Sequence, residues 1–315
     1  MAASLGKIAW IKDGGGFRGA FSVGVSSVLW EHYPPDYMQG VSVGALNAAK
    51  LAESRDPIEL EVIWKKYIEK GGQQTIANLF TVVVNYLQNR NALFSNQGIY
   101  KLVNGLNVNK VAHSPIELDI VTTNERRDNL PEFFSNRNLT QDRYEDFRKA
   151  ICASASMMGL FPPIYISQGL YSDGLNCCVE TALAKGCETI FLFSNNSIWL
   201  TSLIPPENMD FQKRMRRGFQ IEWSRWVLVY LENLLMKHGD LALHVHQDLP
   251  TPIANLASRF KRKNDKDAKK IIFIAPAKNI PTLSTLRFQY GDITSAINHG
   301  KQVAGRLLKQ LQPTI

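Results

Sequence analysis

The stretch KIAWIKDGGGFRG, residues 7–19, and the stretch GVSVG, residues 40–44, decide the fold of this chain. The apolar run at 7–12 predicts a short buried strand, and the glycine triplet 14–16 that follows predicts a turn. From Arg18 to Tyr33 apolar residues recur at the spacing of a helix. The chain therefore begins with a strand, a glycine turn and a helix, which is typical of α/β proteins.

A second strand-and-helix unit follows directly. Pro34 and Pro35 end the first helix, residues 37–41 predict a second strand, and VGALNAAKLAE at 43–53 is rich in helix formers. Further along, the apolar pattern predicts helices at 57–70 and 142–154, a small hairpin around 167–169, and buried strands of the parallel kind at 117–123, 189–193 and 270–274. The predicted fold class is a three-layer α/β/α sandwich with a mainly parallel central sheet and a helical cap insertion.

The predicted cap runs from about Pro206 to Arg262 and differs in character from the rest. It reads as mainly helical, it is rich in Met, Trp, Arg and His, and it lies between two predicted strands. We therefore expect an insertion within a single domain, residues 1–315, and not a second domain. In this division the catalytic core covers about 7–205, and a final strand and C-terminal helix cover about 270–312. The stretch KRKNDKDAK at 261–269 indicates a solvated loop.

The composition is that of an ordinary globular protein. The chain has 315 residues, 45% of them hydrophobic and 20% charged, which excludes disorder as a description of the whole chain. The net charge of +8 suits either simple solubility or attraction to anionic surfaces such as lipid headgroups or nucleic acid. Basic residues concentrate at 213–217 and 261–270.

The cysteines indicate a reducing compartment. Cys152, Cys177, Cys178 and Cys187 lie in or beside apolar runs, so we expect free thiols. We expect no secretory signal and no transmembrane segment, and thus a cytoplasmic protein that meets a membrane, if at all, from its surface. The sequence offers no cluster of metal ligands, so we expect neither a metal nor a cofactor.

The motif Gly40-Val41-Ser42-Val43-Gly44 is the strongest local signal of chemistry. The G-x-S-x-G pattern places a nucleophile on a sharp turn from strand to helix, where small neighbours permit strained backbone angles. At a helix N-terminus, the positive end of the helix dipole assists an oxygen nucleophile and its anionic intermediate. The apolar strand before Ser42 and the Ala-rich helix after it supply this setting.

The loop Asp13 to Gly19, DGGGFRG, is the second signal. Consecutive glycines let several amide groups point at one spot, as an oxyanion hole or a phosphate cradle requires. The loop also matches the dinucleotide pattern G-x-G-x-x-G through Gly14, Gly16 and Gly19. Nucleotide binding needs an acidic residue at the end of the next strand, but here that strand ends in Ser42. We therefore prefer the oxyanion hole.

The third signal is Asp173-Gly174, which alone indicates only a turn. A Ser–His–Asp hydrolase is an alternative, because several histidines follow Ser42 in the chain. In that fold several strands precede the nucleophile, whereas here only one strand-and-helix unit does. The histidines also lack a small, turn-forming context: they are His238, His244, His246 and His299.

Together the three motifs resemble the patatin-like phospholipase family, which has a D/S-G-G-G-x-R-G box, a G-x-S-x-G elbow and a later D-G-G or D-G-A motif. The segment ASASMMGLFPP at 153–163 also resembles the family segment that leads to its catalytic aspartate. The resemblance covers about residues 7–194. Two departures are Leu175, where the family has a small residue, and Met157-Met158, where the family often has a proline.

The resemblance implies a Ser42–Asp173 dyad, in which Ser42 is acylated and Asp173 accepts its proton without a histidine. A partly desolvated carboxylate accepts a proton more readily than an exposed one. The oxyanion would be held by Gly14, Gly15 and Gly16, with Arg18 steadying the loop. The motifs are supported by four further glycines: Gly19, Gly40, Gly44 and Gly174.

The implied substrate is a phospholipid or lysophospholipid. The stretch 211–236 combines basic residues with Phe219, Trp223, Trp226 and Tyr230, which suits a helix lying on an anionic membrane. It equally suits a helix that packs its aromatic side chains onto the core. Two other functions stay open: a catalytically weak regulatory protein that binds membrane or nucleic acid on a hydrolase fold, and a non-lipid carboxylesterase. We find no nucleic-acid reading element and no indication of the oligomeric state.

Overall fold

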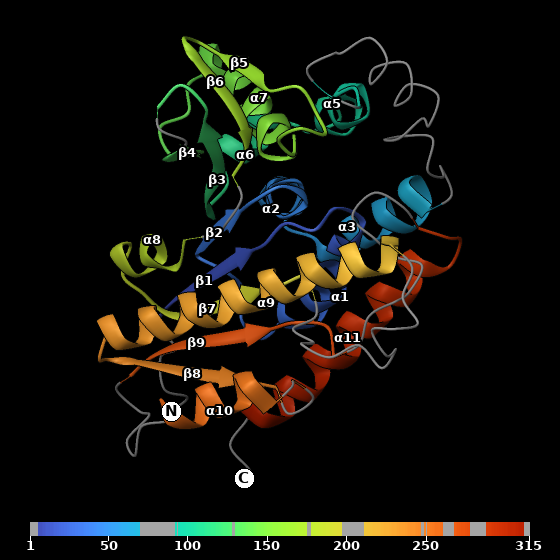
Figure 1. Cartoon of the computed structure of the whole chain (residues 1–315). Coiled ribbons are helices and arrows are strands. Elements are labelled where there is room, and N and C mark those ends of the chain that lie inside the picture. The colour runs from blue at the N-terminus through green and yellow to red at the C-terminus, as the bar shows by residue number, and fades with distance from the viewer. Residues whose placement is uncertain are drawn as a thin grey trace.

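The computed structural model describes residues 6–69, 92, 94–127, 130–174, 178–196, 211–246, 249, 251–260, 268–277 and 288–311, with the backbone alone at 67, 211–223 and 251–252. At the centre lies one sheet (Figure 1), which has nine strands in these ranges. The strands are β1 (Lys7–Lys12), β2 (Tyr37–Gly40), β3 (Glu117–Asn124), β4 (Leu130–Ser135), β5 (Ile164–Ile166), β6 (Gly169–Asp173), β7 (Cys187–Phe193), β8 (Leu241–Val245) and β9 (Lys269–Ile274).

The sheet is parallel through its middle and antiparallel at one end. Its order is β5-β6-β3-β2-β1-β7-β9-β8, and β4 pairs with β3 beside this path. The strands from β3 through β2, β1, β7 and β9 to β8 are parallel neighbours, whereas β4, β5 and β6 pair in antiparallel fashion. The carboxyl ends of β1, β2 and β7 therefore meet at one edge, where ligands bind in open α/β sheets.

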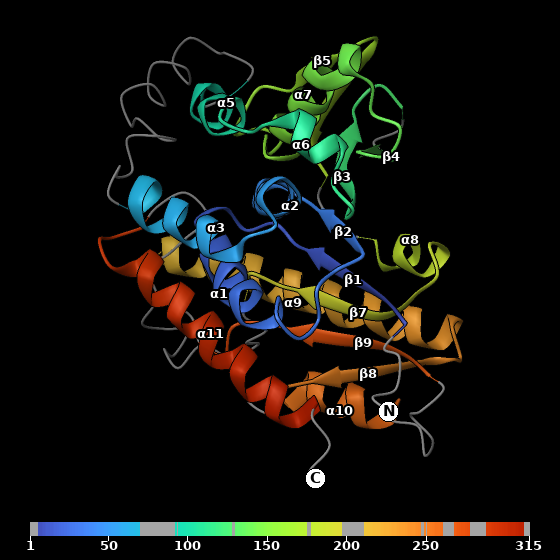
Figure 2. The ribbon, with the colours of Figure 1, turned by 180° about the vertical axis from the view of Figure 1, so that it is seen from behind.

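Helices cover both faces of the sheet (Figures 1 and 2). One apolar core lies between the sheet and α1, α2, α3, α7 and α11, and the other between the sheet and α8, α9 and α10. The helices are α1 (Ala20–Leu29), α2 (Val43–Ser54), α3 (Pro57–Ile63), α5 (Gln97–Asn104), α6 (Val108–Ala112), α7 (Tyr144–Ser154), α8 (Val179–Ala184), α9 (Phe211–Lys237), α10 (Thr251–Arg259) and α11 (Asp292–Leu311), with short 3₁₀ turns at Gly16–Gly19 and Gln141–Arg143 and a π-helical turn at Trp64–Glu69.

The central strand β1 shows why the apolar runs form this sheet. Successive side chains of a strand point to opposite faces, so Trp10 packs against Trp30 and Phe193 while Ile11 enters the other core. Both residues are fully buried. Because both faces are covered, the strand must be apolar on both sides, which explains its continuous hydrophobic pattern.

The predicted fold class is confirmed: the sheet is mostly parallel and lies between two helical layers. Within the described ranges, every predicted strand and helix is present, with its ends shifted by a few residues. The predicted helix 57–70 ends in a π-helical turn, and residue 70 lies outside the described residues. Of the loop predicted at 261–269, residues 261–267 lie outside the described residues, and residue 269 is the first residue of β9.

The stretch 206–262, predicted to be a mainly helical cap, also contributes a strand to the central sheet. Residues 241–245 form β8, which pairs in parallel with β9 and adds an edge strand to the sheet. The helices α9 and α10 pack on the sheet face next to it. The described part of this stretch therefore completes the sheet and covers one face of it. No helix within the described ranges is sufficiently long and apolar to span a bilayer.

Candidate active site

Ser42 lies on a sharp turn between β2 and α2. Its backbone angles, φ 55° and ψ −126°, are rare for a residue other than glycine. The turn is closed by the amide of Gly44, which donates to the Val41 carbonyl at 2.7 Å, and by the amide of Ala45, which donates to the Ser42 carbonyl at 2.9 Å. The amide of Ser42 itself donates to the hydroxyl of Ser154 at 2.9 Å. Ser42 thus begins a helix in a conformation that the surrounding structure must hold.

The turn also needs a glycine at position 44. A Cβ atom there would lie 2.1 Å from the carbonyl oxygen of Lys12, a backbone atom that the sheet fixes. The other glycines that support the motifs also stand in close contact: a Cβ atom would lie 2.5 Å from the nearest atom at Gly19, 2.6 Å at Gly40 and 2.5 Å at Gly174. The glycine pattern of the sequence is therefore explained by close packing around the ends of β1, β2 and β6.

The glycine loop passes directly beside Ser42. A Cβ atom on Gly14 would lie 3.2 Å from Cβ and 3.8 Å from Oγ of Ser42. The amide of Gly14 donates to the carboxylate of its neighbour Asp13 at 2.8 Å. Gly15 and Gly16 have positive φ values of 135° and 57°, and they precede the first hydrogen bond of the following turn, from the Arg18 amide to the Gly15 carbonyl. The amides of Gly15 and Gly16 come before this bond, so they are not part of the hydrogen bonding of the turn that follows.

Two asparagines that follow β7 brace this loop. The side-chain amide of Asn195 donates to the carbonyl of Asp13 at 2.7 Å and to that of Gly14 at 3.2 Å. The guanidinium of Arg18 donates to the side-chain oxygen of Asn196 at 2.5 Å. This bond attaches Arg18 to the segment that follows β7. Sequence reasoning missed both asparagines, although a polar pair just beyond the predicted strand 189–193 was a usable signal.

Asp173 is the last residue of β6 and is 5% exposed. It pairs with Thr122 of β3, and its amide donates to the carbonyl of Ser156 at 3.0 Å. Ser154, which accepts the amide of Ser42, donates its hydroxyl to the carbonyl of Val121 at 2.6 Å. Ser42 and Asp173 are thus attached to the same two segments, the end of α7 and the middle of β3. Ser154 was not recognised in the sequence as part of the site.

Asp13 places a second carboxyl group at this site. Burial raises the pKa of Asp13 from its ordinary value of 3.8 to about 7, and the negative charge of Asp173 raises it further, while the hydrogen bond from Gly14 opposes both effects. Asp13 before the glycine loop and Asp173 at the end of β6 thus interact electrostatically. Asp13 therefore holds a proton at pH values where an exposed aspartate is ionised.

An apolar cavity of about 440 Å³ opens beside Ser42. It lies on the sheet face covered by α1 and α2, and its walls come from α2, α3, α5 and α7 as well as from the glycine loop. Met157 lines this cavity, whereas its neighbour Met158 is exposed. Leu175, the other departure from the family pattern, lies outside the described residues. Side chains that line the cavity include Phe17, Ser42, Leu46, Ile63, Trp64, Leu102 and Met157.

Three of the histidines that follow Ser42 in the sequence have described contacts in other parts of the fold. His244 lies in β8 opposite Ile272, a ring nitrogen of His246 lies 2.8 Å from the Ala275 carbonyl, and His299 accepts from the Ala277 amide. In the part of the chain that the structure describes, no three His, Cys, Asp or Glu side chains form a group able to hold a metal ion.

The fold and this edge define a class: an α/β protein with a serine on a sharp strand-to-helix turn beside a glycine loop. The family profile described as patatin-like phospholipase matches residues 12–179, more than half of the chain. The chain belongs to the patatin-like phospholipase family, and it is thereby a lipid acyl hydrolase at the level of the family.

Two solved structures are similar at low sequence identity. VipD from Legionella pneumophila is 14% identical with a TM-score of 0.48, and the match covers 98% of this chain and 67% of VipD. The type III effector protein ExoU is 13% identical with a TM-score of 0.33, and the match covers 96% of this chain and 53% of ExoU. This chain thus spans about two thirds of the first structure and about half of the second. No curated protein matches the chain.

Proposed function

We propose that the chain hydrolyses fatty-acyl esters of phospholipids or lysophospholipids through an acyl intermediate on Ser42, with Asp173 as the base. One observation carries this proposal: Ser42 begins α2 on a strained turn and, at the same time, lines the wall of an apolar cavity. A nucleophile in such a wall meets the carbonyl carbon of an ester whose acyl chain occupies the cavity.

The expected reaction has two steps. Asp173 accepts the proton of the Ser42 hydroxyl, and the oxygen attacks the ester carbonyl to form a tetrahedral oxyanion. The amides of Gly15 and Gly16 stabilise this oxyanion, and in other hydrolases one such donor contributes about 3–4 kcal/mol. The intermediate collapses, the alcohol leaves with the proton from Asp173, and water then releases the fatty acid by the same route. In this scheme Gly14 supports the loop through its bond to Asp13 and does not hold the oxyanion.

The cavity supports a lipid acyl chain as the group that is bound. Its volume lies within the range of small-molecule pockets, about 300–1,000 Å³, and its walls are mainly aliphatic and aromatic. The acyl chain itself carries no polar group whose desolvation would oppose its burial there. We further propose that residues 1–315 form a single domain, because strands from both halves of the chain pair in one sheet.

We also propose that the protein is cytoplasmic and contacts an anionic membrane peripherally through residues 211–236. Trp226, Val229 and Met236 of α9 are exposed, at 39%, 50% and 69%, and they recur at the spacing of one helix face. Arg225 beside them is also exposed. The basic side chains at 213–217 lie outside the described residues.

The proposal is tested with Ser42→Ala and Asp173→Asn, which should each abolish release of fatty acid and leave the fold intact. The purified proteins are incubated with vesicles that contain a panel of phospholipids and lysophospholipids, and the products are identified by mass spectrometry. Ser27→Ala is the matched control, because the hydroxyl of Ser27 donates only to the Gly24 carbonyl of its own helix. Turnover by either site variant at the level of this control would refute the dyad.

A further inference from the structure

Cys178, which follows Asp173 in the chain, is hydrogen-bonded to β2, the strand that precedes Ser42. Gln39 of β2 accepts a hydrogen bond from the amide of Cys178 at 2.6 Å and donates one to the carbonyl of the same residue at 3.2 Å. One side chain thus holds both backbone groups of Cys178, much as a neighbouring strand would. Gln39 lies three residues before Ser42, and Cys178 lies five residues after Asp173.

Burial makes these bonds costly to break. Gln39 is fully buried, and an amide in such a position that loses its partners costs about 1–3 kcal/mol. Its side chain lies on the same face of β2 as Tyr37, the face covered by α8 and α9, because residues two apart in a strand share a face. The contact therefore crosses from the sheet to the start of α8.

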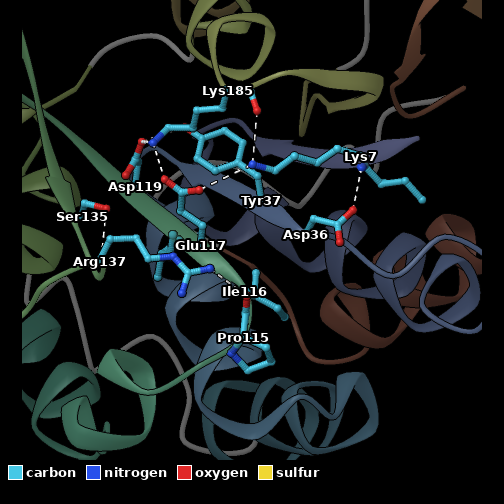
Figure 3. A network of polar contacts seen from close by, with 12 residues as sticks. Lys7, Asp36, Tyr37, Pro115, Ile116, Glu117, Asp119, Ser135, Arg137 and Lys185 are labelled. Carbon is cyan, nitrogen blue, oxygen red and sulfur yellow. Dashed lines mark hydrogen bonds and ion pairs between the residues drawn. The ribbon is translucent and has the colours of Figure 1, made fainter. Parts of the chain in front are cut away.

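Hydrogen bonds in a charged network determine the orientation of the Gln39 side-chain amide, that is, the positions of its oxygen and its nitrogen. The hydroxyl of Tyr37 donates to the carboxylate of Asp119 at 2.9 Å, so it can only accept from Gln39, whose nitrogen lies 3.2 Å away. Figure 3 shows Tyr37 and Asp119 with Lys185, whose ammonium group lies 3.3 Å from the Asp119 carboxylate. Since the nitrogen of Gln39 faces Tyr37 and the Cys178 carbonyl, its oxygen must face the Cys178 amide.

Tyr230 of α9 holds the same segment from the other side. Its hydroxyl accepts from the amide of Val179 at 2.9 Å and donates to the carboxylate of Glu180 at 2.6 Å. The ring of Tyr230 stacks on Trp226, with 5.3 Å between the ring centroids and 6° between the planes. Hydrogen bonds from β2 and from α9 thus hold residues 178–180 at the start of α8.

We infer that Gln39 and Tyr230 are positioning residues that set the carboxylate of Asp173 relative to Ser42, an inference that rests on the dyad proposed above. On its N-terminal side, Asp173 is held by the pairing of β6 with β3 and by the bond of its amide to Ser156. On its C-terminal side, Gly174 packs closely against the backbone of Val121. Further along the chain, Gln39 and Tyr230 hold residues 178–180 by hydrogen bonds. Removing these hydrogen bonds takes away the described attachments of residues 178–180 to β2 and α9, so the backbone that carries Asp173 is held less firmly.

The main test is Gln39→Met, which keeps the length of the side chain and removes its polar atoms. With p-nitrophenyl butyrate as substrate, kcat should fall about ten- to a hundredfold while KM stays within about twofold, because a misplaced base impairs the transition state and not binding. The rate at which a fluorophosphonate labels Ser42 should fall by a similar factor. Tyr230→Phe, which removes one oxygen atom, should lower kcat about three- to tenfold.

Asn136→Leu is the matched control. Asn136 is also a fully buried amide with three bonds to the backbone, from the Leu118 amide and to the Val111 and Ile116 carbonyls. Its loss should lower the melting temperature as much as Gln39→Met does and leave kcat within about twofold. An equal loss of kcat in both variants, or an unchanged kcat in Gln39→Met, would overturn the inference.

If Gln39→Met does not fold, Tyr230→Phe provides the test. A wild-type kcat in Tyr230→Phe would then overturn the inference. Failure of the dyad itself gives a different result. In that case Ser42→Ala and Asp173→Asn retain activity, whereas an error confined to Gln39 and Tyr230 leaves those two variants inactive.

Discussion

Replacing Asp13 by Asn should change how the stability of the protein depends on pH. Asn is nearly isosteric and can still accept the amide of Gly14, but it cannot ionise. In the folded protein the pKa of Asp13 is raised to about 7, mainly by burial, whereas in the unfolded chain it returns to about 3.8. Between these values the folded state binds more protons than the unfolded state, so the contribution of Asp13 to stability falls as the pH rises.

The size of the effect follows from the shift. One pH unit corresponds to about 1.36 kcal/mol, so a shift of about three units corresponds to about 4 kcal/mol as an upper limit. The contribution of Asp13 is complete below about pH 4 and is lost as the pH rises through 7. Asp13→Asn should therefore gain stability relative to the wild type from pH 4 to pH 8, by up to about 4 kcal/mol.

The measurement is urea unfolding of both proteins at half-unit steps from pH 4 to pH 8. The difference between the two free energies of unfolding isolates Asp13 from other groups, notably the buried Lys12, whose pKa burial lowers to about 7. Because the unfolded chain protonates Lys12 more readily, that group adds stability as the pH rises above 7 in both proteins alike. Asp142→Asn, at an exposed site, serves as control. If the difference between the two free energies of unfolding changes by less than about 0.5 kcal/mol across this pH range, the conclusion that Asp13 is protonated in the folded protein is refuted.

Two further predictions concern the elbow and the cavity. Ser154→Ala removes the acceptor of the Ser42 amide and the donor to the Val121 carbonyl, so it should cost about 1–3 kcal/mol in urea unfolding and lower kcat as well; full activity in a stable variant would contradict this. Leu46→Trp adds bulk to the cavity wall, so kcat/KM for a palmitoyl ester should fall at least about tenfold more than for a butyryl ester. Equal losses on the two esters would show that the acyl chain lies elsewhere.

Much of the fold could be predicted from the sequence, because its signals are local. The strand at 7–12 is apolar on both sides and stops at three glycines, and the elbow motif marks the end of β2 and the start of α2. These elements have regular periods and clear ends. The family motifs likewise lie on short stretches, so Ser42, Asp173 and the glycine loop could be proposed as a site from the sequence.

Contacts between distant segments could not be predicted in this way. β8 was missed because LALHV is a short segment flanked by helical segments, and its pairing with β9, which stabilises it as a strand, joins segments far apart in the sequence. Ser154 looks like any small helix residue until the fold brings it beneath position 42. Gln39 lies inside a strand where a buried amide has no periodic signature, and its partner Cys178 is far away in the sequence. The cavity arises from four helices together.

The proposed contact with a membrane must agree with the side on which the cavity lies. The exposed residues Trp226, Val229 and Met236 lie on α9, which covers the sheet face opposite the cavity. A bilayer against that part of the helix would therefore lie far from the acyl-chain site. Only a short link joins Lys237 to β8, so α9 runs antiparallel to the parallel strands (Figure 1). Its first turns therefore point toward the strand edge where the glycine loop and Ser42 lie. A contact that delivers lipid to the site would have to use this amino-terminal end of α9, where the sequence concentrates its basic residues.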